Sequence, residues 1–201
     1  MSRLNELLSQ AGLDAVSPEA DQQFSLYLEL LLKWNAKLNL TSIRTPEEIL
    51  GRHFLESIFC AHFVPKETKT LLDFGSGGGF PGIPIAICRP EIAVTLSESQ
   101  GKKASFLREV VRTLGLNATV YDGRAENILD RFDAVTLRAV DKMASAVSAA
   151  VDLMAPGGTM LLMIGAGDAE SLSDPRLTWQ SPISMPAALN KVILAGRRRA
   201  T

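Results

Sequence analysis

An acidic residue and a run of glycines stand together in residues 71–87, LLDFGSGGGFPGIPIAI. Asp73 ends an apolar run, and Gly75, Gly77 and Gly79 follow it at every second position. Glycine adopts positive φ readily and has no side chain, so a ligand can come close to the backbone amides of such a turn. The spacing therefore predicts a ligand-binding turn, and the neighbouring acid indicates the charge of the ligand.

Three classes of ligand use glycine-rich turns of this kind. A Walker-type phosphate loop needs Lys and Ser or Thr after its last glycine, but Gly82 is followed by Ile83. The remaining spacing fits either the turn of S-adenosylmethionine enzymes or, less directly, that of NAD-dependent oxidoreductases. Asp73 favours the first class, because a carboxylate repels a pyrophosphate and can bind an ammonium group through a charge-assisted hydrogen bond. We expect Asp73 and the three glycines to bind S-adenosylmethionine.

Two further segments have the residue types that a nucleoside requires. Glu98 ends the next predicted strand, where a carboxylate can accept hydrogen bonds from both ribose hydroxyls. Residues 122–126, DGRAE, follow the third predicted strand, and the backbone of Ala125 and Glu126 could border an adenine there. By itself Glu126 also fits the start of a surface helix.

Arg138 ends the fourth predicted strand and could hold the cofactor or donate to guanine O6 or a phosphate. A salt bridge to Asp133 or Asp141 is the structural alternative. The segment lacks the Asn/Asp-Pro-Pro-aromatic signature of enzymes that methylate exocyclic amines, and no cysteine follows strand four or five to attack a pyrimidine. Both absences favour a ring nitrogen as methyl acceptor, which needs alignment and no general base. Arg138 is therefore the one predicted catalytic residue, with a positioning role.

The elements that must position these residues change in character along the chain. Ser17-Pro18 and Thr45-Pro46 are helix-start signals, and the residues after them have helical spacing of apolar side chains. From Thr70 onward, short apolar runs alternate with helical patterns, which predicts a doubly wound parallel sheet. RLTWQSPIS (176–184) and KVILAGRRR (191–199) predict two further strands. We expect an α/β protein with a helical extension over residues 1–65 and a Rossmann-like domain over 66–201.

Composition and charge are ordinary for a soluble globular protein: 46% of the 201 residues are hydrophobic, 21% are charged, and the formal net charge is −1. No export signal or membrane-spanning run is present, so we expect a cytoplasmic protein without a membrane partner. Cys60 and Cys88 lack metal-ligand spacing, so we expect no metal. From Pro175 to the end there are five basic residues and no acid, which allows a basic face on a near-neutral chain.

Several of the motifs together resemble one known family. They are DFGSGGGFPGIPIAI (73–87), NLTSI (39–43), HFLES (53–57), GKKASFLREV (101–110) and FDAVTLRAV (132–140). The chain resembles the bacterial small-subunit rRNA guanine-N7 methyltransferases, also called glucose-inhibited division protein B, from about Leu26 to Arg198. The resemblance implies a class I S-adenosylmethionine-dependent methyltransferase with an antiparallel last strand and an N-terminal helical extension. It further implies methylation of N7 of guanine 527 in the 530 loop of 16S rRNA, with 16S rRNA or the 30S subunit as partner.

The resemblance also implies roles for individual residues. The family contacts its cofactor at positions that correspond here to Gly75, Phe80, Ala125, Glu126 and Arg138. Where many members have a lysine this chain has Ile164, so a role for that lysine does not carry over. Candidate substrate contacts are Asn39, His53, Lys102, Lys103, Arg197 and Arg198.

The structural alternatives for those six residues are a helix cap or a buried hydrogen bond for the first two and a solvated basic face for the others. Two further functions stay open at this point, an NAD-dependent oxidoreductase and a non-catalytic RNA-binding factor in ribosome assembly. The sequence does not determine the oligomeric state, although we favour a monomer.

Overall fold

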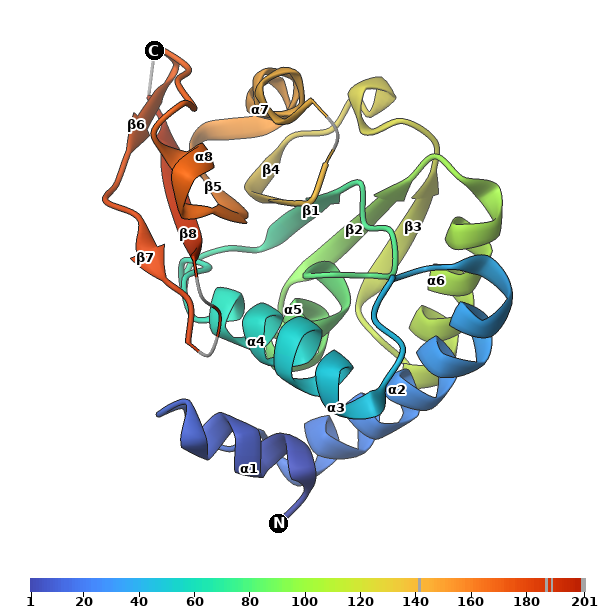
Figure 1. The fold of residues 1–201 in the computed structure, drawn as a ribbon. Coiled ribbons are helices and arrows are strands. Elements are labelled where there is room, and N and C mark those ends of the chain that lie inside the picture. Colours follow the sequence, from blue (N-terminus) through green and yellow to red (C-terminus); the bar gives the residue numbers. More distant parts are fainter. Residues whose placement is uncertain (141, 187, 189, 200–201) are drawn as a thin grey trace.

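A single mixed sheet forms the centre of the computed structural model, which describes residues 1–140, 142–186, 188 and 190–199. The strand order is β3-β2-β1-β4-β5-β8-β6, and β7 also pairs with β8 (Figure 1). The pairs among β1 to β5 are parallel, whereas β8 runs antiparallel to β5. The strands are β1 (Thr70–Phe74), β2 (Ala93–Glu98), β3 (Ala118–Asp122), β4 (Phe132–Arg138), β5 (Met154–Gly165), β6 (Leu177–Trp179), β7 (Ile183–Ser184) and β8 (Lys191–Arg198). The predicted doubly wound sheet with an antiparallel last strand is confirmed.

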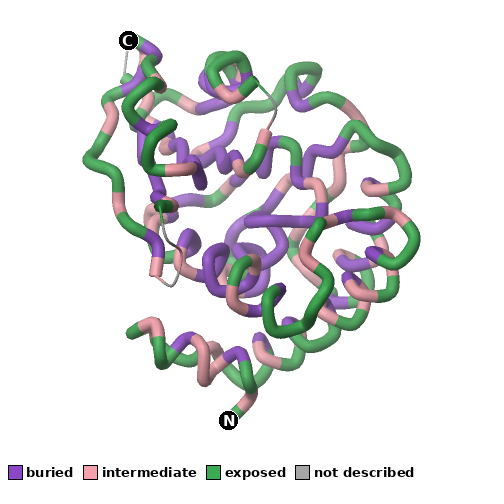
Figure 2. The backbone as a smooth tube through the Cα atoms, viewed as in Figure 1, coloured by how far each residue is buried: buried purple, intermediate pink, exposed green. Residues whose placement is uncertain are grey.

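Alternate residues of the central strands enter two different hydrophobic clusters. In β1, Leu71 belongs to one cluster and Leu72 to the other, and Leu161 and Leu162 in β5 divide in the same way. This follows from the two-residue period of a strand, which sends successive side chains to opposite faces. The buried centre of the molecule in Figure 2 is therefore the sheet together with the inner sides of its covering helices. Those helices are α5 (Gly82–Cys88), α6 (Gly101–Leu114), α7 (Met143–Asp152) and the short α8 (Ala166–Ala169).

The first 61 residues are mainly helical, as predicted. Ser17 and Thr45 cap their helices by accepting from the amides of Ala20 and Glu48, at 3.2 and 3.3 Å. The elements are α1 (Arg3–Gln10), α2 (Pro18–Leu38), α3 (Pro46–Ile49), a π-helical turn η1 (Leu50–Phe54) and α4 (Leu55–Ala61). These helices share one hydrophobic cluster with β1, α5 and α6, and α2 and α4 pack on α5 and α6, the helices that cover that face of the sheet.

The region after β5 differs in detail from the prediction. The segment 176–184, predicted as one strand, forms β6 and β7, which both pair with β8. Pro182 lies between them, and proline cannot donate a ladder hydrogen bond. Among the described residues, no helix is long and apolar enough to cross a membrane.

Candidate active site

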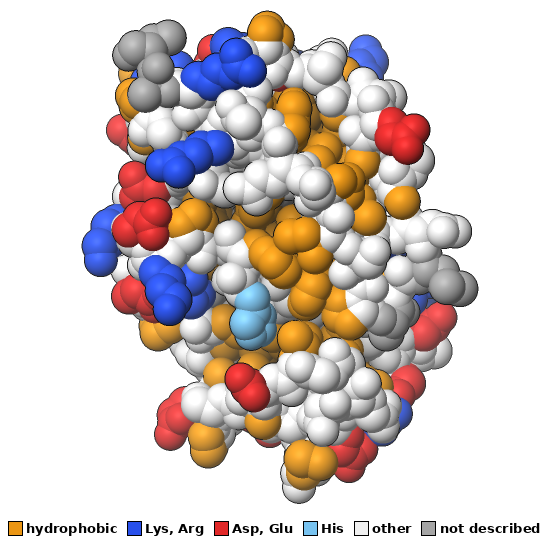
Figure 3. Space-filling view, turned by 90° about the vertical axis from the view of Figure 1, so that its left-hand side faces the viewer, with side chains coloured by type: hydrophobic (Ala, Val, Ile, Leu, Met, Phe, Trp, Pro, Cys, Tyr) orange, Lys and Arg blue, Asp and Glu red, His pale blue; other side chains and the backbone are white. Residues whose placement is uncertain are grey.

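A cavity of about 950 Å³ lies at the carboxyl ends of β1, β2, β4 and β5. This is where parallel α/β sheets bind ligands, and the volume is at the upper end of the usual range of about 300–1,000 Å³. The helical extension closes one side through residues 40–42 and α4, and β8 contributes Lys191. Figure 3 shows hydrophobic side chains gathered in the middle of one face of the molecule, with Lys and Arg side chains to one side.

Two of the three predicted glycines face this cavity. Gly75 (φ +74°) and Gly77 (φ +56°) line it, and both have the positive φ that glycine allows. Gly79 (φ +95°) does not line it. A Cβ at Gly79 would lie 2.7 Å from both the Tyr27 hydroxyl and Ile83 Cγ1. The absence of a side chain at Gly79 allows α2 to pack closely on the turn, and the predicted contact of Gly79 with the cofactor stays a prediction.

Asp73 lies beneath the turn and not in the cavity wall. Its side chain is buried, with 1% of the residue exposed. One carboxylate oxygen accepts from the Thr136 hydroxyl at 2.8 Å and the other from the Gly82 amide at 3.2 Å. Burial raises the pKa of Asp73 to about 6, although the hydrogen bonds from Thr136 and Gly82 oppose this rise. Asp73 does not line the cavity, so the structure does not place its carboxylate where the predicted contact with an ammonium group would form. The hydrogen bonds of Asp73 hold the turn in place.

Glu98 lies at the end of β2 and lines the cavity, as the prediction required. Its two oxygens accept from the amides of Gly77 and Gln100, at 2.9 and 2.8 Å. Each carboxylate oxygen can accept more than one hydrogen bond, so a ribose hydroxyl can still be accommodated. Glu98 therefore joins the glycine turn to the carboxyl end of the neighbouring strand.

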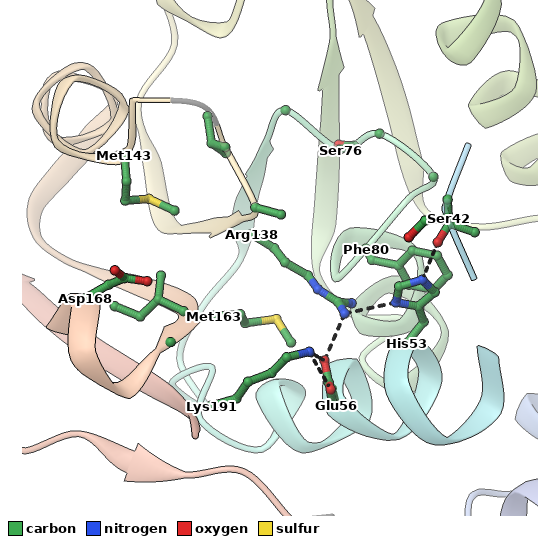
Figure 4. Close-up of a pocket in the computed structure, with 18 of the residues that line it drawn as sticks. Ser42, His53, Glu56, Ser76, Phe80, Arg138, Met143, Met163, Asp168 and Lys191 are labelled. Carbon is green, nitrogen blue, oxygen red and sulfur yellow. Dashed lines mark hydrogen bonds and ion pairs between the residues drawn. The ribbon is translucent and has the colours of Figure 1, made fainter. Parts of the chain in front are cut away.

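Arg138 reaches from the end of β4 toward the helical extension. Its Nη2 donates to the Arg52 carbonyl (3.0 Å), His53 Nδ1 (2.9 Å) and Glu56 Oε2 (2.8 Å), as Figure 4 shows for the two side chains. Its Nη1 is buried and has no hydrogen-bond partner among the described residues. The alternative salt bridge to Asp133 is wrong, because Asp133 accepts from Lys69 and Thr70. Asp141 lies outside the described residues.

His53 is a neutral base in this arrangement. A guanidinium only donates, so Nδ1 must be the acceptor and Nε2 has the hydrogen. Nε2 then donates to the Thr41 hydroxyl at 2.7 Å. The ring also stacks on Phe80, with 4.6 Å between centroids. Burial, reinforced by the charge of Arg138, lowers the pKa of His53 to about 3.

The remaining predicted residues divide between the cavity and other surfaces. Phe80 and Lys103 line the cavity. Ala125 and Glu126 form the short 3-10 turn η2 (Ala125–Asn127) after β3, and neither lines it. Asn39 is the exposed C-cap of α2 and accepts from Arg44. Lys102 is exposed on α6 outside the cavity wall.

Arg197 and Arg198 lie at the end of the sheet opposite to the cavity, where the parallel strands begin. They end β8, whereas Lys191 begins it beside Gly165 at the carboxyl end of β5. Arg197 is six positions after Lys191 in extended chain, about 20 Å along the strand. The structure therefore does not bring these two arginines to the cavity, because an antiparallel last strand places its end away from it, and their contact with the substrate stays a prediction.

Glu56 and Lys191 also lie at this site, although neither was predicted as a site residue from the sequence. Glu56 stands three positions after His53 in HFLES, on the same helix face, and this spacing was the only local signal. Lys191 has no local signal, because only the β5–β8 register brings it to the cavity. Apolar residues also line the cavity, namely Met143, Met163, Ile164, Leu172 and Met185.

These features fit an S-adenosylmethionine molecule. The turn offers backbone without side chains at Gly75 and Gly77, and Glu98 offers a carboxylate at the adjacent strand. Arg138 lines the cavity, and its Nη1, which has no hydrogen-bond partner among the described residues, has two hydrogens to donate. Within the described residues, no group of three or more His, Cys, Asp or Glu side chains could hold a metal ion.

Comparison with known folds agrees with this architecture. An O-methyltransferase from Bacillus cereus in complex with SAH superposes with a TM-score of 0.62 at 16% identity, covering 98% of each chain. The Methanococcus jannaschii fibrillarin pre-rRNA processing protein superposes with a TM-score of 0.54 at 15% identity, covering 68% of this chain and 69% of that one. At such identities the likeness concerns the fold alone.

Sequence comparison is more specific. The Ribosomal RNA small subunit methyltransferase G of Stenotrophomonas maltophilia (strain K279a) is 42% identical over 203 residues, covering 97% of this chain and 90% of that protein. The protein of the same name from Neisseria meningitidis serogroup B is 40% identical over 172 residues, covering 85% and 82%. The family model GidB, described as rRNA small subunit methyltransferase G, matches residues 20–194. The predicted resemblance is confirmed, and the chain belongs to the rRNA small subunit methyltransferase G family.

Proposed function

We propose that this protein transfers a methyl group from S-adenosyl-L-methionine to N7 of a guanine in the 530 loop of 16S rRNA. Family membership makes the chain an rRNA methyltransferase with S-adenosylmethionine as methyl donor. The guanine and its N7 atom are the finer part of the proposal. The observation that carries it is a cavity enclosed by residues of the matched segment, with Arg138 at its junction with the helical extension.

The cofactor is held, in this proposal, by residues at the ends of β1 and β2. Gly75 and Gly77 let it approach the backbone, and Glu98 accepts from the ribose hydroxyls. Ala125 and Glu126 border the adenine through their backbone, a role that the family resemblance supports. Asp73 acts indirectly by fixing Gly82 and Thr136 under the turn. When bound, S-adenosylmethionine supplies an electrophilic methyl group on a sulfonium.

Guanine N7 has a lone pair and no proton at neutral pH, so the chain does not need to supply a general base. Its residues must align the base with the methyl group and exclude water. Met143, Met163 and Leu172 give the cavity an apolar wall against which the flat face of a base can lie. Figure 4 shows Met143 on the side of the cavity away from His53, with Met163 between Met143 and Glu56 in this view.

The partner in this proposal is 16S rRNA, free or within the 30S subunit. Lys103 at the cavity edge is positioned to meet a phosphate, since Lys and Arg supply most contacts to nucleic-acid backbones. We place the protein in the cytoplasm as a monomer, as the sequence favoured.

The decisive test incubates the protein with labelled S-adenosylmethionine and 30S subunits from a strain that lacks this enzyme. We expect one methyl group per 16S rRNA, located at N7 of a 530-loop guanine by mass mapping and by chain cleavage at 7-methylguanosine. Protein-free 16S rRNA, tested in parallel, separates the two forms of substrate. Methylation at another atom or loop would refute the finer assignment, and no methylation of either substrate would refute the activity.

A further inference from the structure

Three elements that are far apart in the sequence meet at the carboxylate of Glu56. Lys191 Nζ donates to its two oxygens at 2.8 and 3.1 Å, and Arg138 Nη2 donates to Oε2 at 2.8 Å. Glu56 lies on α4 of the helical extension, Arg138 ends β4 and Lys191 begins β8. Figure 4 shows the three side chains converging between the cavity and α4. The cluster thus joins the extension to two strands of the sheet.

Two of the three charged side chains in this cluster are buried or mostly buried. Glu56 is 1% exposed, and the side chain of Arg138 is 12% exposed. A buried charge without a partner destabilises a protein strongly, so the carboxylate is tolerated because it neutralises two nearby cations. Together the three groups have one net positive charge at the edge of the cavity, and the neutral ring of His53 adds none.

The two arms of the Arg138 guanidinium have different surroundings. All three hydrogen bonds of the side chain involve Nη2, which faces Arg52, His53 and Glu56. Nη1 has no partner among the described residues, although buried polar atoms are nearly always paired. One arm is therefore anchored on the helical extension, and the other is held in place without an acceptor.

We propose that Glu56 is a positioning residue for methyl transfer, which anchors one arm of Arg138 so that the other arm meets a ligand oxygen in the cavity. The proposal rests on the proposed function. The oxygen belongs either to the carboxylate of the cofactor or to the guanine base, and both are acceptors for a guanidinium. In this proposal Glu56, although it borders the cavity, acts through Arg138.

Arg138→Lys tests the two-arm geometry. A lysine can still pair with Glu56, but its single nitrogen cannot also reach a ligand as a second arm. We expect turnover on 30S subunits to fall about 100-fold, which is the usual effect when a group that aligns the reactants is misplaced. The thermal midpoint should stay close to that of the wild type. Arg176→Lys is the matched control, because Arg176 also bonds two carboxylates, Asp152 and Asp174, but does not line the cavity. It should leave turnover unchanged.

The role of Glu56 is tested with its charge compensated. Glu56→Gln alone leaves the mostly buried Arg138 and the partly exposed Lys191 without their shared carboxylate and risks unfolding, so it is combined with Lys191→Met, which restores the original net charge. The double variant has lost the ion pair between Arg138 and residue 56, because a glutamine oxygen accepts only as a neutral group, whereas Lys191→Met alone retains that ion pair. We expect turnover of the double variant to lie at least about tenfold below that of Lys191→Met, with both folded by circular dichroism.

Calorimetry with S-adenosylhomocysteine identifies the ligand oxygen and separates this proposal from the proposed function. If Arg138→Lys and the double variant bind it more weakly, the oxygen belongs to the cofactor. If affinity is unchanged while KM for 30S subunits rises or kcat falls, the oxygen belongs to the base. Equal turnover of the double variant and Lys191→Met, or normal turnover of Arg138→Lys, would overturn the proposal. An inactive wild type that still binds S-adenosylhomocysteine would instead refute the proposed function.

Discussion

The hydroxyl of Tyr27 donates to the carbonyl oxygen of Gly78 at 2.5 Å, which ties α2 of the helical extension to the middle of the glycine turn. Tyr27 is fully buried, and its ring stacks on Phe54 with 5.1 Å between centroids. Burial raises the pKa of Tyr27 well above its usual value, so the hydroxyl keeps its proton and remains a donor. The helical extension therefore helps to define the shape of the cofactor turn.

Tyr27→Phe tests this connection. The variant keeps the ring packing but leaves the Gly78 carbonyl without its donor, which should lower the free energy of unfolding by about 1–3 kcal/mol. Because the turn is then held less firmly, we expect weaker binding of S-adenosylhomocysteine by calorimetry. Equal affinity and equal stability would show that the rest of the turn suffices without this hydrogen bond.

The two faces of the glycine turn should respond differently to a methyl group. Gly79→Ala places Cβ 2.7 Å from the Tyr27 hydroxyl and from Ile83, so we expect a loss of about 3 kcal/mol in denaturant unfolding. Gly77→Ala meets no atom closer than 4.0 Å, so only its φ of +56° should count, at about 1 kcal/mol. Gly77 faces the cavity. Gly77→Ala should therefore lose more cofactor affinity than Gly79→Ala for each kcal/mol of stability that it loses. The opposite ranking would contradict the assigned faces.

Asp73 should make an unusual contribution to the pH dependence of stability. Its pKa of about 6 in the folded protein lies above the ordinary value of 3.8. The protonated form is therefore favoured by folding, and this contribution is present below pH 3.8 and lost as pH rises through 6. Asp73→Asn does not titrate, so the free energy of unfolding of the wild type should fall by about 2 kcal/mol relative to that of the variant between pH 4 and pH 7. Urea unfolding at several pH values would measure this, and a constant difference would refute the buried ionisation.

His53 should make the opposite contribution to the pH dependence of stability, since its effect is lost as pH falls. Its pKa is about 3 in the folded protein and 6.5 ordinarily, so the unfolded chain binds the proton first as pH falls. The contribution of the neutral ring is complete above pH 6.5 and decreases as pH falls toward 3. Between pH 7 and pH 5 the wild type should lose about 2 kcal/mol relative to His53→Asn, which does not titrate. If the free energy of unfolding fell equally in the two proteins between pH 7 and pH 5, this prediction would be wrong.

The basic residues near the cavity and those at the far sheet edge should differ in their effect on RNA binding. Lys103→Gln should weaken binding to an rRNA fragment and reduce the slope of log affinity against log salt by about 1. Arg197→Gln, at the opposite edge, is the matched control and should change neither quantity. Fluorescence anisotropy over a salt series would measure both, and equal effects would indicate that RNA extends over both edges.

The sequence by itself determined the elements and the location of the site. Apolar alternation and helical spacing predicted the parallel sheet and the helical extension, because both periods are properties of the local backbone. The glycine turn, Glu98 and Arg138 were predicted at the carboxyl ends of their strands, and the cavity lies there. In a parallel sheet these ends share one edge, so local order along the chain was sufficient.

Only the tertiary structure decided which side chains face the ligand. Asp73 and Gly79 belong to the same turn as Gly75 and Gly77, yet packing against Thr136 and Tyr27 directs them away from the cavity. Glu56 meets Lys191 across 135 positions, through helix packing on one side and antiparallel strand register on the other. Such contacts depend on how whole elements stack and pair, and no short stretch of sequence specifies that by itself.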